Sequence, residues 1–404
     1  MRAAFELHRT DIAAEMELHS NCYQTLNTPE SQNSQLHSTI EEISHEFAIA
    51  GDFVEGHEIN SGHINTTYLA TYRRESGEIR RYILQRINEQ VFKDPLAVMH
   101  NVECVTRHIN WKVLRVKRDL GGQTLNLYPA RGGRFYARGE GGGIWRCYNF
   151  IEGCQTYDIV ENTRQAYQAA RAFGSFQDLV EDIPAEDIIE TIPDFHHTPK
   201  RYARLMEVVE NDPMGRRAGV EKEIAFVRER AELCATLVDL LKEGKLPARI
   251  THNDTKLNNV MMDAETDEAV CVIDLDTVMP GLSLYDFGDL VRTATSPAAE
   301  DETDLSKVEM RMPMFEALAE GYLDGCDCLT PLEIEHLVTG GKVITLETGI
   351  RFLTDYLEGD VYFKTHYGEH NLDRCRTQLR LVECIEQNEP EMRDFVKRVS
   401  RAIN

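Results

Sequence analysis

Apolar residues alternate with polar ones through the first third of the chain, after a polar start. This period of two is typical of β-strands with one buried face and covers three segments: residues 53–59, 66–72 and 80–87. Residues 94–110 change to helical spacing, and residues 113–150 alternate again between glycine-rich turns. The pattern predicts an antiparallel sheet with one main helix. Residues 1–40 are expected to form a poorly ordered extension.

From residue 151 onward, apolar positions recur every three to four residues, which predicts helices with one buried face. The segments with this spacing are residues 164–180, 221–241, 332–346, 348–357 and 371–387. Because 404 residues exceed one ordinary hydrophobic core, two lobes are expected. The predicted boundaries are residues 41–150 for a sheet-rich lobe and residues 151–404 for a mostly helical lobe, an α+β fold.

One segment of the second lobe breaks the helical pattern. Two short apolar pieces, residues 249–250 and 260–262, flank a polar loop, and a turn then leads to a buried strand at residues 269–273. The loop has the order His-x-Asp-(four residues)-Asn, with Asp254 and Asn259, and the strand ends at Asp274. The hairpin is therefore expected to bring Asp274 close to Asn259.

This combination is typical of phosphoryl transfer. One carboxylate, Asp254, would accept the proton of an attacking hydroxyl, while Asn259 and Asp274 would bind Mg²⁺ on nucleotide phosphates. Mg²⁺ keeps several waters, so two protein ligands suffice. An acidic chain contains many solvated Asp and Asn residues, but their order, spacing and strand context here are hard to reach by chance.

The composition restricts the partners. A formal charge of −24 argues against nucleic acid or an anionic membrane surface, because both attract basic patches. No apolar run approaches the roughly 20 residues of a membrane helix, and the acidic start does not resemble a secretory signal. The ten cysteines are thus expected to be reduced thiols in a cytoplasmic protein. No structural zinc site is expected, since the closest pair is Cys326 and Cys328.

The motifs resemble those of the aminoglycoside-phosphotransferase/choline-kinase-like family, and within it the N-acetylhexosamine 1-kinases. Besides the loop around Asp254, the resemblance rests on Gly62-His63-Ile64-Asn65, Tyr82-Ile83-Leu84-Gln85-Arg86, Trp145-Arg146, Phe150-Ile151-Glu152-Gly153 and Arg351-Phe352-Leu353-Thr354-Asp355-Tyr356. It covers about residues 45–385. It implies a bilobal protein-kinase-like fold, with ATP as co-substrate and Mg²⁺ as cofactor.

The resemblance also assigns nucleotide-binding roles. The turn that contains Ser61, Gly62, His63 and Asn65 would fold over the triphosphate, although these residues also favour a plain hairpin turn. Kinases place a phosphate-binding Lys on the third strand. Here Gln85 matches that position, and Arg86 points to the other face, so either a neutral hydrogen bond or Arg86 replaces the Lys.

The partner Glu of that Lys would lie on the following helix, where the matching position is Asn101, with Glu103 as the alternative. Ile151 and Glu152 would meet the adenine edge as a hinge. Asp286 would brace the catalytic loop from the start of the next helix, a position where an ordinary helix cap is also expected.

The resemblance implies phosphorylation of the anomeric (C1) hydroxyl of an N-acetylhexosamine. His252 would support the loop, Lys256 would steady the migrating charge, and Asp276 could hold a second ion. Arg351 and Tyr362 would face the sugar. For Arg351, a salt bridge with Glu347 or Asp355 is an equal alternative. The partners are thus a sugar and ATP, and a monomer or weak oligomer is expected.

Two other functions stay open. One is a kinase of the same fold that acts on choline, ethanolamine, homoserine, an aminoglycoside or another sugar. Choline and aminoglycosides are cations, which Arg351 would disfavour. The other is a catalytically inactive nucleotide-binding module, suggested by the missing third-strand Lys. The sequence leaves open whether GlcNAc or GalNAc, and ATP or GTP, is preferred.

Overall fold

The computed structural model describes residues 30–59, 64–116 and 124–403, and these divide into two compact units. The first unit contains the described residues up to Val91 together with Leu127–Phe150, and the second contains Phe92–Asn126 and the chain from Ile151 onward. The expected lobe of residues 41–150 therefore differs from the first unit. Residues 92–126 belong to the second unit, because helix α3 (Pro95–Val116) packs on that unit's α4.

The first unit is built on a five-stranded antiparallel sheet with the strand order β1-β2-β3-β5-β4. Its strands are β1 (Asp52–Ile59), β2 (Thr66–Arg73), β3 (Ile79–Arg86), β4 (Ala137–Arg138) and β5 (Ile144–Asn149). The predicted alternation is confirmed: on β3 the side chains of Tyr82 and Leu84 are buried, and those between them are more exposed.

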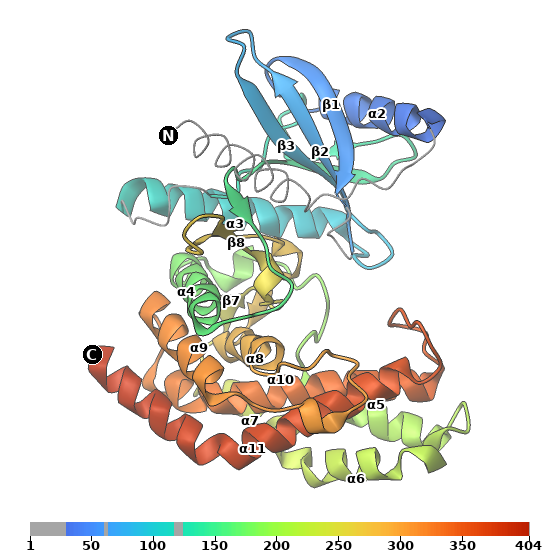
Figure 1. Cartoon of the computed structure of the whole chain (residues 1–404), viewed down its shortest axis with the longest axis vertical. Coiled ribbons are helices and arrows are strands. Elements are labelled where there is room, and N and C mark those ends of the chain that lie inside the picture. Colours follow the sequence, from blue (N-terminus) through green and yellow to red (C-terminus); the bar gives the residue numbers. More distant parts are fainter. Residues whose placement is uncertain (1–29, 60–63, 117–123, 404) are drawn as a thin grey trace, which may run out of the picture. The chain divides into compact units, whose positions relative to one another are not determined.

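Helix α2 (Glu30–His45) lies beside β1 and β2 (Figure 1). Ile40 is fully buried in the core of this unit, and the Ser44 hydroxyl lies 2.6 Å from the hydroxyl of Tyr72. A Cβ at Gly56 of β1 would lie 2.5 Å from a methyl group of Ile40, so the glycine lets the helix approach the strand. The prediction of a poorly ordered segment to residue 40 is thus wrong from Glu30 onward.

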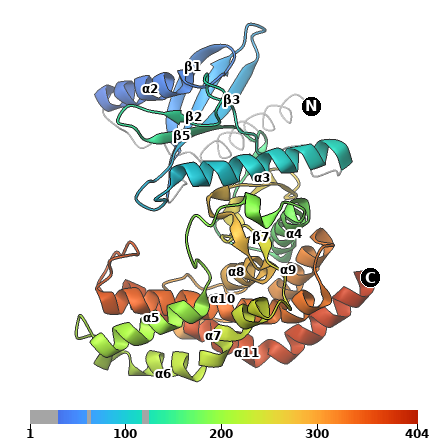
Figure 2. The ribbon, with the colours of Figure 1, turned by 180° about the vertical axis from the view of Figure 1, so that it is seen from behind.

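The second unit is mostly helical. Its longer helices are α3, α4 (Thr163–Val180), α5 (Thr198–Asn211), α6 (Glu221–Glu229), α7 (Ala231–Lys242), α8 (Ser283–Ala294), α9 (Met312–Gly325), α10 (Pro331–Glu358) and α11 (His370–Ile403). Helices α10 and α11 run side by side, and α5, α6 and α7 lie along them (Figure 2). This confirms the predicted α+β class. None of the described helices is long and apolar enough to cross a membrane.

Two helix boundaries differ from the prediction. Residues 221–241 form two helices, because the chain leaves helical geometry at Arg230, whose guanidinium packs on Phe226 and pairs with Glu386. Conversely, α10 continues through residue 347, where an interruption was expected. Glu347 is buried in the middle of this helix.

Two small sheets hold the predicted catalytic segment. Strand β7 (Arg249–Thr251) pairs with β10 (Met279–Gly281), and β8 (Val260–Asp263) lies between β6 (Cys154–Gln155) and β9 (Ala269–Val272). The predicted strand–loop–strand arrangement is confirmed. The polar loop runs from β7 to β8 and ends in a short 3₁₀ turn, η3 (Leu257–Asn259).

Candidate active site

The loop after β7 is fixed by its own side chains. Asn253 adopts a left-handed backbone conformation with φ of 65°, which Asn tolerates better than most residues. Its side-chain amide donates to the carbonyl oxygens of Thr251 and Thr277 at 3.2 and 2.9 Å. The Thr277 hydroxyl donates in turn to the carbonyl of His252 at 2.7 Å. The loop is therefore joined to the segment that follows β9.

Asp254, Lys256 and Asn259 converge at the end of this loop. The Lys256 ammonium lies 2.7 Å from Oδ1 of Asp254, and Nδ2 of Asn259 donates to Oδ2 at 3.1 Å and to the Asp254 carbonyl at 2.8 Å. Burial alone would raise the pKa of Asp254, but Lys256 and His252 hold it below the ordinary value. Asp254 is thus an ionised carboxylate within a half-buried cluster.

Asp274 follows the strand that pairs with Asn259. The backbone N–H of Ile273 donates to the carbonyl of Asn259 at 2.9 Å, and the carbonyl of Ile273 lies 2.9 Å from Nε2 of His252. Asp274 comes next, with φ of 58° and an exposed side chain, whereas Asp276 is 3% exposed within the turn η4 (Leu275–Thr277). The hairpin therefore brings Asp274 to the neighbourhood of Asn259, as its sequence predicts.

Asp286 holds the loop from behind. Its carboxylate accepts the backbone N–H groups of His252 and Asn253 at 2.9 and 2.7 Å, and the Gln177 amide at 3.1 Å. The hydroxyl of Thr255 donates to its carbonyl at 2.6 Å. Burial raises the pKa of this carboxyl to about 6. Asp286 lies in the first turn of α8 and not at its cap, so its side chain is directed to the loop.

A cation and three aromatic rings form a cluster on the segments next to this loop. The guanidinium carbon of Arg351 lies 5.6 Å from the ring centre of Phe195, 6.0 Å from that of Tyr362 and 5.5 Å from that of Phe363. Tyr362 is largely exposed, with 69% of its surface accessible. We call Arg351, Phe195, Tyr362 and Phe363 the aromatic–arginine cluster.

Glu347 and Asp355, the alternative partners of Arg351, form hydrogen bonds with other groups. Glu347 lies 2.8 Å from Nδ1 of His196, and Asp355 accepts the backbone N–H groups of residues 361–363. Among the residues that the structure describes, Arg351 forms no ion pair within 4 Å. The salt bridge with Glu347 or Asp355, one of the two alternatives for Arg351, is therefore not formed, and the guanidinium keeps its donors available.

A second arginine lies against the same cluster. Nη2 of Arg201 donates to the carbonyl of Phe195 at 3.2 Å, and its buried Nε has no hydrogen-bond partner. Burial and the nearby charge of Arg351 lower the pKa of Arg201. His196 connects this region to the catalytic loop, since its Nε2 lies 3.5 Å from the carbonyl of Asn253. Two guanidinium groups thus share a surface next to the loop.

In the first unit, the amide of Gln85 is occupied by protein groups. Its Oε1 accepts from Nε and Nη2 of Arg146 at 3.0 and 2.8 Å, and its Nε2 donates to Thr67 at 3.1 Å. Arg146 is 1% exposed, whereas Arg86 is exposed and lies against Gly143. The side chain of Gln85 is therefore hydrogen-bonded to a buried cation on β5 and to Thr67.

The other residues predicted to bind nucleotide are placed as follows. Asn65 accepts the backbone N–H of Asn88 at 3.0 Å, so its side chain closes a turn. Ile151 is buried and Glu152 exposed, directly after the last residue of the first unit. Ser61, Gly62 and His63 lie outside the described residues.

The helix position expected to hold a Glu has a structural role within the second unit. Asn101 is 1% exposed, and its amide donates to the carbonyls of Ile189 and Val278 at 2.7 and 3.0 Å and accepts the N–H of Ile189 at 2.9 Å. Glu103 instead lies 3.6 Å from Arg107. Asn101 therefore fastens α3 to the segment that follows the catalytic hairpin.

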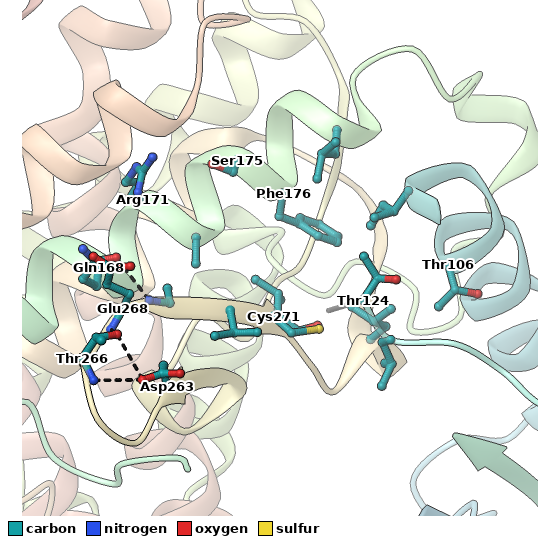
Figure 3. Close-up of a pocket in the computed structure, with 18 residues that line it drawn as sticks. Thr106, Thr124, Gln168, Arg171, Ser175, Phe176, Asp263, Thr266, Glu268 and Cys271 are labelled. Atoms are coloured by element: carbon teal, nitrogen blue, oxygen red, sulfur yellow. Dashed lines mark hydrogen bonds between the residues drawn. The ribbon is translucent and has the colours of Figure 1, made fainter. Parts of the chain in front are cut away.

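A cavity of about 330 Å³ lies between α3, α4 and the β8–β9 hairpin (Figure 3). Phe176 and Cys271 project toward it, and Asp263, Thr266 and Glu268 lie at one end. None of the residues predicted to act in catalysis or to bind metal lines this cavity. It is therefore separate from the cluster around Asp254.

Three residues around the catalytic loop, Gln177, His196 and Arg201, and one residue of the first unit, Arg146, were not predicted as site residues. Each acts through a neighbour that is distant in the sequence, such as Asp286 for Gln177 and Glu347 for His196. For Arg146 a signal was present, because strand alternation places it on the same face as Gln85 once β3 and β5 are paired.

Comparisons with known proteins show the family and agree with the fold. The sequence model of the Phosphotransferase enzyme family matches residues 55–323. Among solved structures, the aminoglycoside phosphotransferase from Alicyclobacillus acidocaldarius is similar with a TM-score of 0.59 and 13% identity, over 94% of this chain and 99% of that one. Amicoumacin kinase in complex with AMP-PNP, Ca²⁺ and Ami is similar with a TM-score of 0.52 and 11% identity, over 88% and 96% of the two chains. At these identities the likeness concerns the fold alone.

Proposed function

Since this chain belongs to the phosphotransferase enzyme family, we propose that it transfers the γ-phosphoryl group of ATP to the anomeric hydroxyl of an N-acetylhexosamine. The proposal is carried by one observation. The hydrogen bond from Asn259 to Asp254, at 3.1 Å, joins the proposed metal ligand to the proposed proton acceptor. The backbone hydrogen bond from the N–H of Ile273 to the carbonyl of Asn259 holds the residue before Asp274 against Asn259.

The residues fit a hard cation. Because Nδ2 of Asn259 donates to Asp254, the amide is oriented and its oxygen is left as an acceptor. Together with the exposed carboxylate of Asp274, this gives two oxygen ligands of the kind that Mg²⁺ prefers. Asp276, two residues after Asp274, offers a further oxygen ligand. Mg²⁺, when bound, would neutralise charge on the triphosphate.

The proposed mechanism uses Asp254 as the proton acceptor. It orients the acceptor hydroxyl and takes its proton as the oxygen attacks the γ-phosphorus and the bond to the β-phosphate oxygen breaks. Lys256 keeps Asp254 ionised and offers a positive charge to the transferring group. His252 is buried between Phe173 and Phe176, so it supports the loop and does not reach substrate.

The aromatic–arginine cluster supports a sugar acceptor. The rings of Phe195, Tyr362 and Phe363 offer faces for the apolar side of a pyranose, and the unpaired donors of Arg351 suit hydroxyl groups or an N-acetyl carbonyl. Two neighbouring guanidinium groups disfavour cationic acceptors such as choline or an aminoglycoside. The roles of Asn65, Gln85, Arg86, Ile151 and Glu152 toward ATP remain proposals from the family resemblance.

An ADP-release assay with Mg-ATP over a panel of sugars, choline, ethanolamine, homoserine and aminoglycosides tests the substrate. Proton and phosphorus NMR of the product then identifies the phosphorylated oxygen. We expect turnover with N-acetylhexosamines and a phosphate on C1. Turnover with an amino alcohol alone would support the alternative kinase, and binding of ATP without turnover on the panel would support the inactive module.

The residue assignment is tested by Asp254→Asn, which keeps the shape of the side chain and removes the proton acceptor. Turnover should fall at least ~10²-fold, the usual scale for loss of a general base. The matched control is Asp304→Asn, because Asp304 caps the short turn η5 (Leu305–Lys307) on the surface and Asn caps equally well. Equal turnover in the two variants would contradict the role of Asp254.

A further inference from the structure

Two thiols and two carboxylates meet where α4 and α9 end. Asp178 and Glu181 lie at the end of α4, and Cys326 and Cys328 follow α9. The ligand atoms of Asp178, Glu181 and Cys328 all lie within 4.8 Å of one another. The sulfur atoms of Cys326 and Cys328 are 3.1 Å apart. We call these four residues the thiol–carboxylate cluster.

Close packing of the two helices creates this cluster. A Cβ at Gly174 of α4 would lie 2.5 Å from the carbonyl oxygen of Tyr322, and one at Gly325 of α9 would lie 2.3 Å from the carbonyl oxygen of Arg171. Both positions therefore require glycine, which lets the helix backbones touch. The same contact brings together cysteines and carboxylates that are about 150 positions apart in the sequence.

We propose that the thiol–carboxylate cluster binds one divalent zinc ion. Zn²⁺ takes four ligands from Cys, His, Asp and Glu, with Zn–S distances of about 2.3 Å and Zn–O distances of about 2.0–2.2 Å. Tetrahedral geometry at those lengths places ligand atoms about 3.3–3.8 Å apart. The ligand atoms of Asp178, Glu181 and Cys328, which lie within 4.8 Å of one another, are near this spacing. Cys326, whose sulfur lies 3.1 Å from that of Cys328, would become the fourth ligand after a side-chain rotation that separates the two sulfur atoms. The two thiols lose their protons to solvent when they bind the ion.

Neighbouring residues hold the thiol–carboxylate cluster in place. Nη2 of Arg249 donates to the carbonyl of Cys328 at 2.5 Å, and its Nε pairs with Glu333 at 2.5 Å, so the loop that carries the thiols is held in place. Cys326 is 4% exposed and Asp178 is 8% exposed, whereas Glu181 is exposed and leaves a path for an ion. The ligands other than Glu181 would thus be partly shielded from water.

The cluster adjoins the support of the catalytic loop. Gln177, which precedes Asp178 on α4, donates to Asp286 and to the carbonyl of Ile250. Arg249 begins β7, the strand that leads into the loop. A bound ion would therefore join the ends of α4 and α9 behind the loop. We assign it a structural role that is independent of the proposed phosphoryl transfer.

This site could not be expected from the sequence, because Cys326 and Cys328 alone lack the usual spacing of two ligand pairs. The proposal differs from the expectation of no structural zinc site. It needs the tertiary contact of α4 with α9, which supplies the two carboxylates.

The test uses the full chain, reduced and stripped of metal with a chelator, then titrated with Co²⁺ and with Zn²⁺. We expect the thiolate-to-cobalt absorption and the visible bands of a tetrahedral site, with one ion per chain. Cys328→Ser should abolish the thiolate band. Glu181→Gln should weaken binding at least ~10-fold, because loss even of a group that only orients a ligand has that effect. Since Glu181 is exposed, this variant should keep its fold.

Cys154→Ser is the control, because Cys154 is a half-buried thiol outside the cluster and should leave the cobalt spectrum unchanged. The proposal is overturned if the reduced wild-type chain binds no Co²⁺ or Zn²⁺, or if Cys328→Ser and Glu181→Gln bind both ions as the wild type does. A disulfide between Cys326 and Cys328 that persists under reductant would also overturn it. None of these readouts depends on kinase activity.

Discussion

The carboxylate of Asp286 is buried, yet it accepts three N–H donors, and such a group needs its negative charge to keep all three. Burial raises its pKa to about 6. Below that pH the carboxyl takes up a proton, and one of its oxygens can no longer accept as before. The backbone of His252 and Asn253 then loses part of its support. The loop should therefore become less ordered as the pH falls through about 6.

We accordingly predict that kcat declines as the pH falls through about 6. Asp254 does not cause this decline, because its pKa lies below the ordinary value. Gln177→Met removes one donor to the Asp286 carboxylate and should shift the decline upward by about one pH unit, as expected for one hydrogen bond to a charged group. The measurement is kcat against pH at saturating substrates.

Gln165→Met is the control, because Gln165 is also buried on α4 and does not contact Asp286. An unchanged midpoint in Gln177→Met would show that Asp286 does not control the pH profile.

The buried guanidinium of Arg146 leads to a second prediction. Gln85 gives it two hydrogen bonds, and Gln85→Leu would leave those donors without an acceptor. The free energy of unfolding should fall by about 2–3 kcal/mol, the scale for lost hydrogen bonds to a buried charge. Urea denaturation measures it. Gln90→Leu changes an exposed glutamine near the same strand and should alter stability little. Equal stabilities would mean that Gln85 does not sustain Arg146.

At the scale of elements, helix α8 is positioned by its contact with α10. A Cβ at Gly340 of α10 would lie 2.4 Å from the carbonyl oxygen of Leu284 in α8, and one at Gly288 would lie 2.5 Å from the carbonyl oxygen of Gly340. These are backbone atoms, which cannot turn aside as a side chain can. The two helices therefore touch along glycines, and this contact places Asp286 beneath the loop.

Gly340→Ala should therefore destabilise the protein, although Ala is about 1 kcal/mol more favourable than Gly within a helix. The clash outweighs that gain, and we expect a net loss of about 1–3 kcal/mol together with a lower kcat, since α8 must shift. Thermal unfolding and turnover measure the two effects. Gly219→Ala is the control, because a Cβ there meets no atom within 4 Å. A more stable Gly340→Ala would refute the close contact.

The elements differ in how well the sequence predicts them. Strands β1 to β3 and the hairpin of β8 and β9 are predicted from local alternation. The closeness of Asp254 and Asn259 is also predicted, because a short loop separates them in the sequence. Helix α2 was missed because its residues are mostly polar, and only a few, such as Ile40, reach the core. The roles of Gln177 and Arg201 could not be predicted, since each depends on a partner brought close by packing.

At the scale of the whole molecule, the described chain forms two units that its backbone connects at three points: residues 91–92, 126–127 and 150–151. Helix α3 is held within the second unit, because Asn101 binds backbone groups of Ile189 and Val278. A ligand that binds only the native protein raises the free energy of unfolding of the full chain, whichever residues bind it.

Mg-ATP should raise the free energy of unfolding of the full chain by about 2.7 kcal/mol at a ligand concentration of about 100 times Kd, because only the native state binds it. Asp274→Asn removes the charge of one proposed metal ligand, so it should lose most of the difference between Mg-ATP and ATP with chelator. Asp254→Asn should keep that difference, because it removes a proton acceptor and leaves both metal ligands. Thermal and urea unfolding measure these changes.

The pattern across variants distinguishes two causes of inactivity. If Asp254→Asn is inactive but still stabilised by Mg-ATP, the loss lies in proton transfer and not in nucleotide binding. Asp304→Asn should match the wild type in every condition, because its substitution conserves a surface cap. A wild-type chain that Mg-ATP does not stabilise would contradict the proposed function, since an ATP-dependent enzyme must bind its co-substrate in the native state. Stabilisation that survives in Asp274→Asn would contradict the proposed metal site alone.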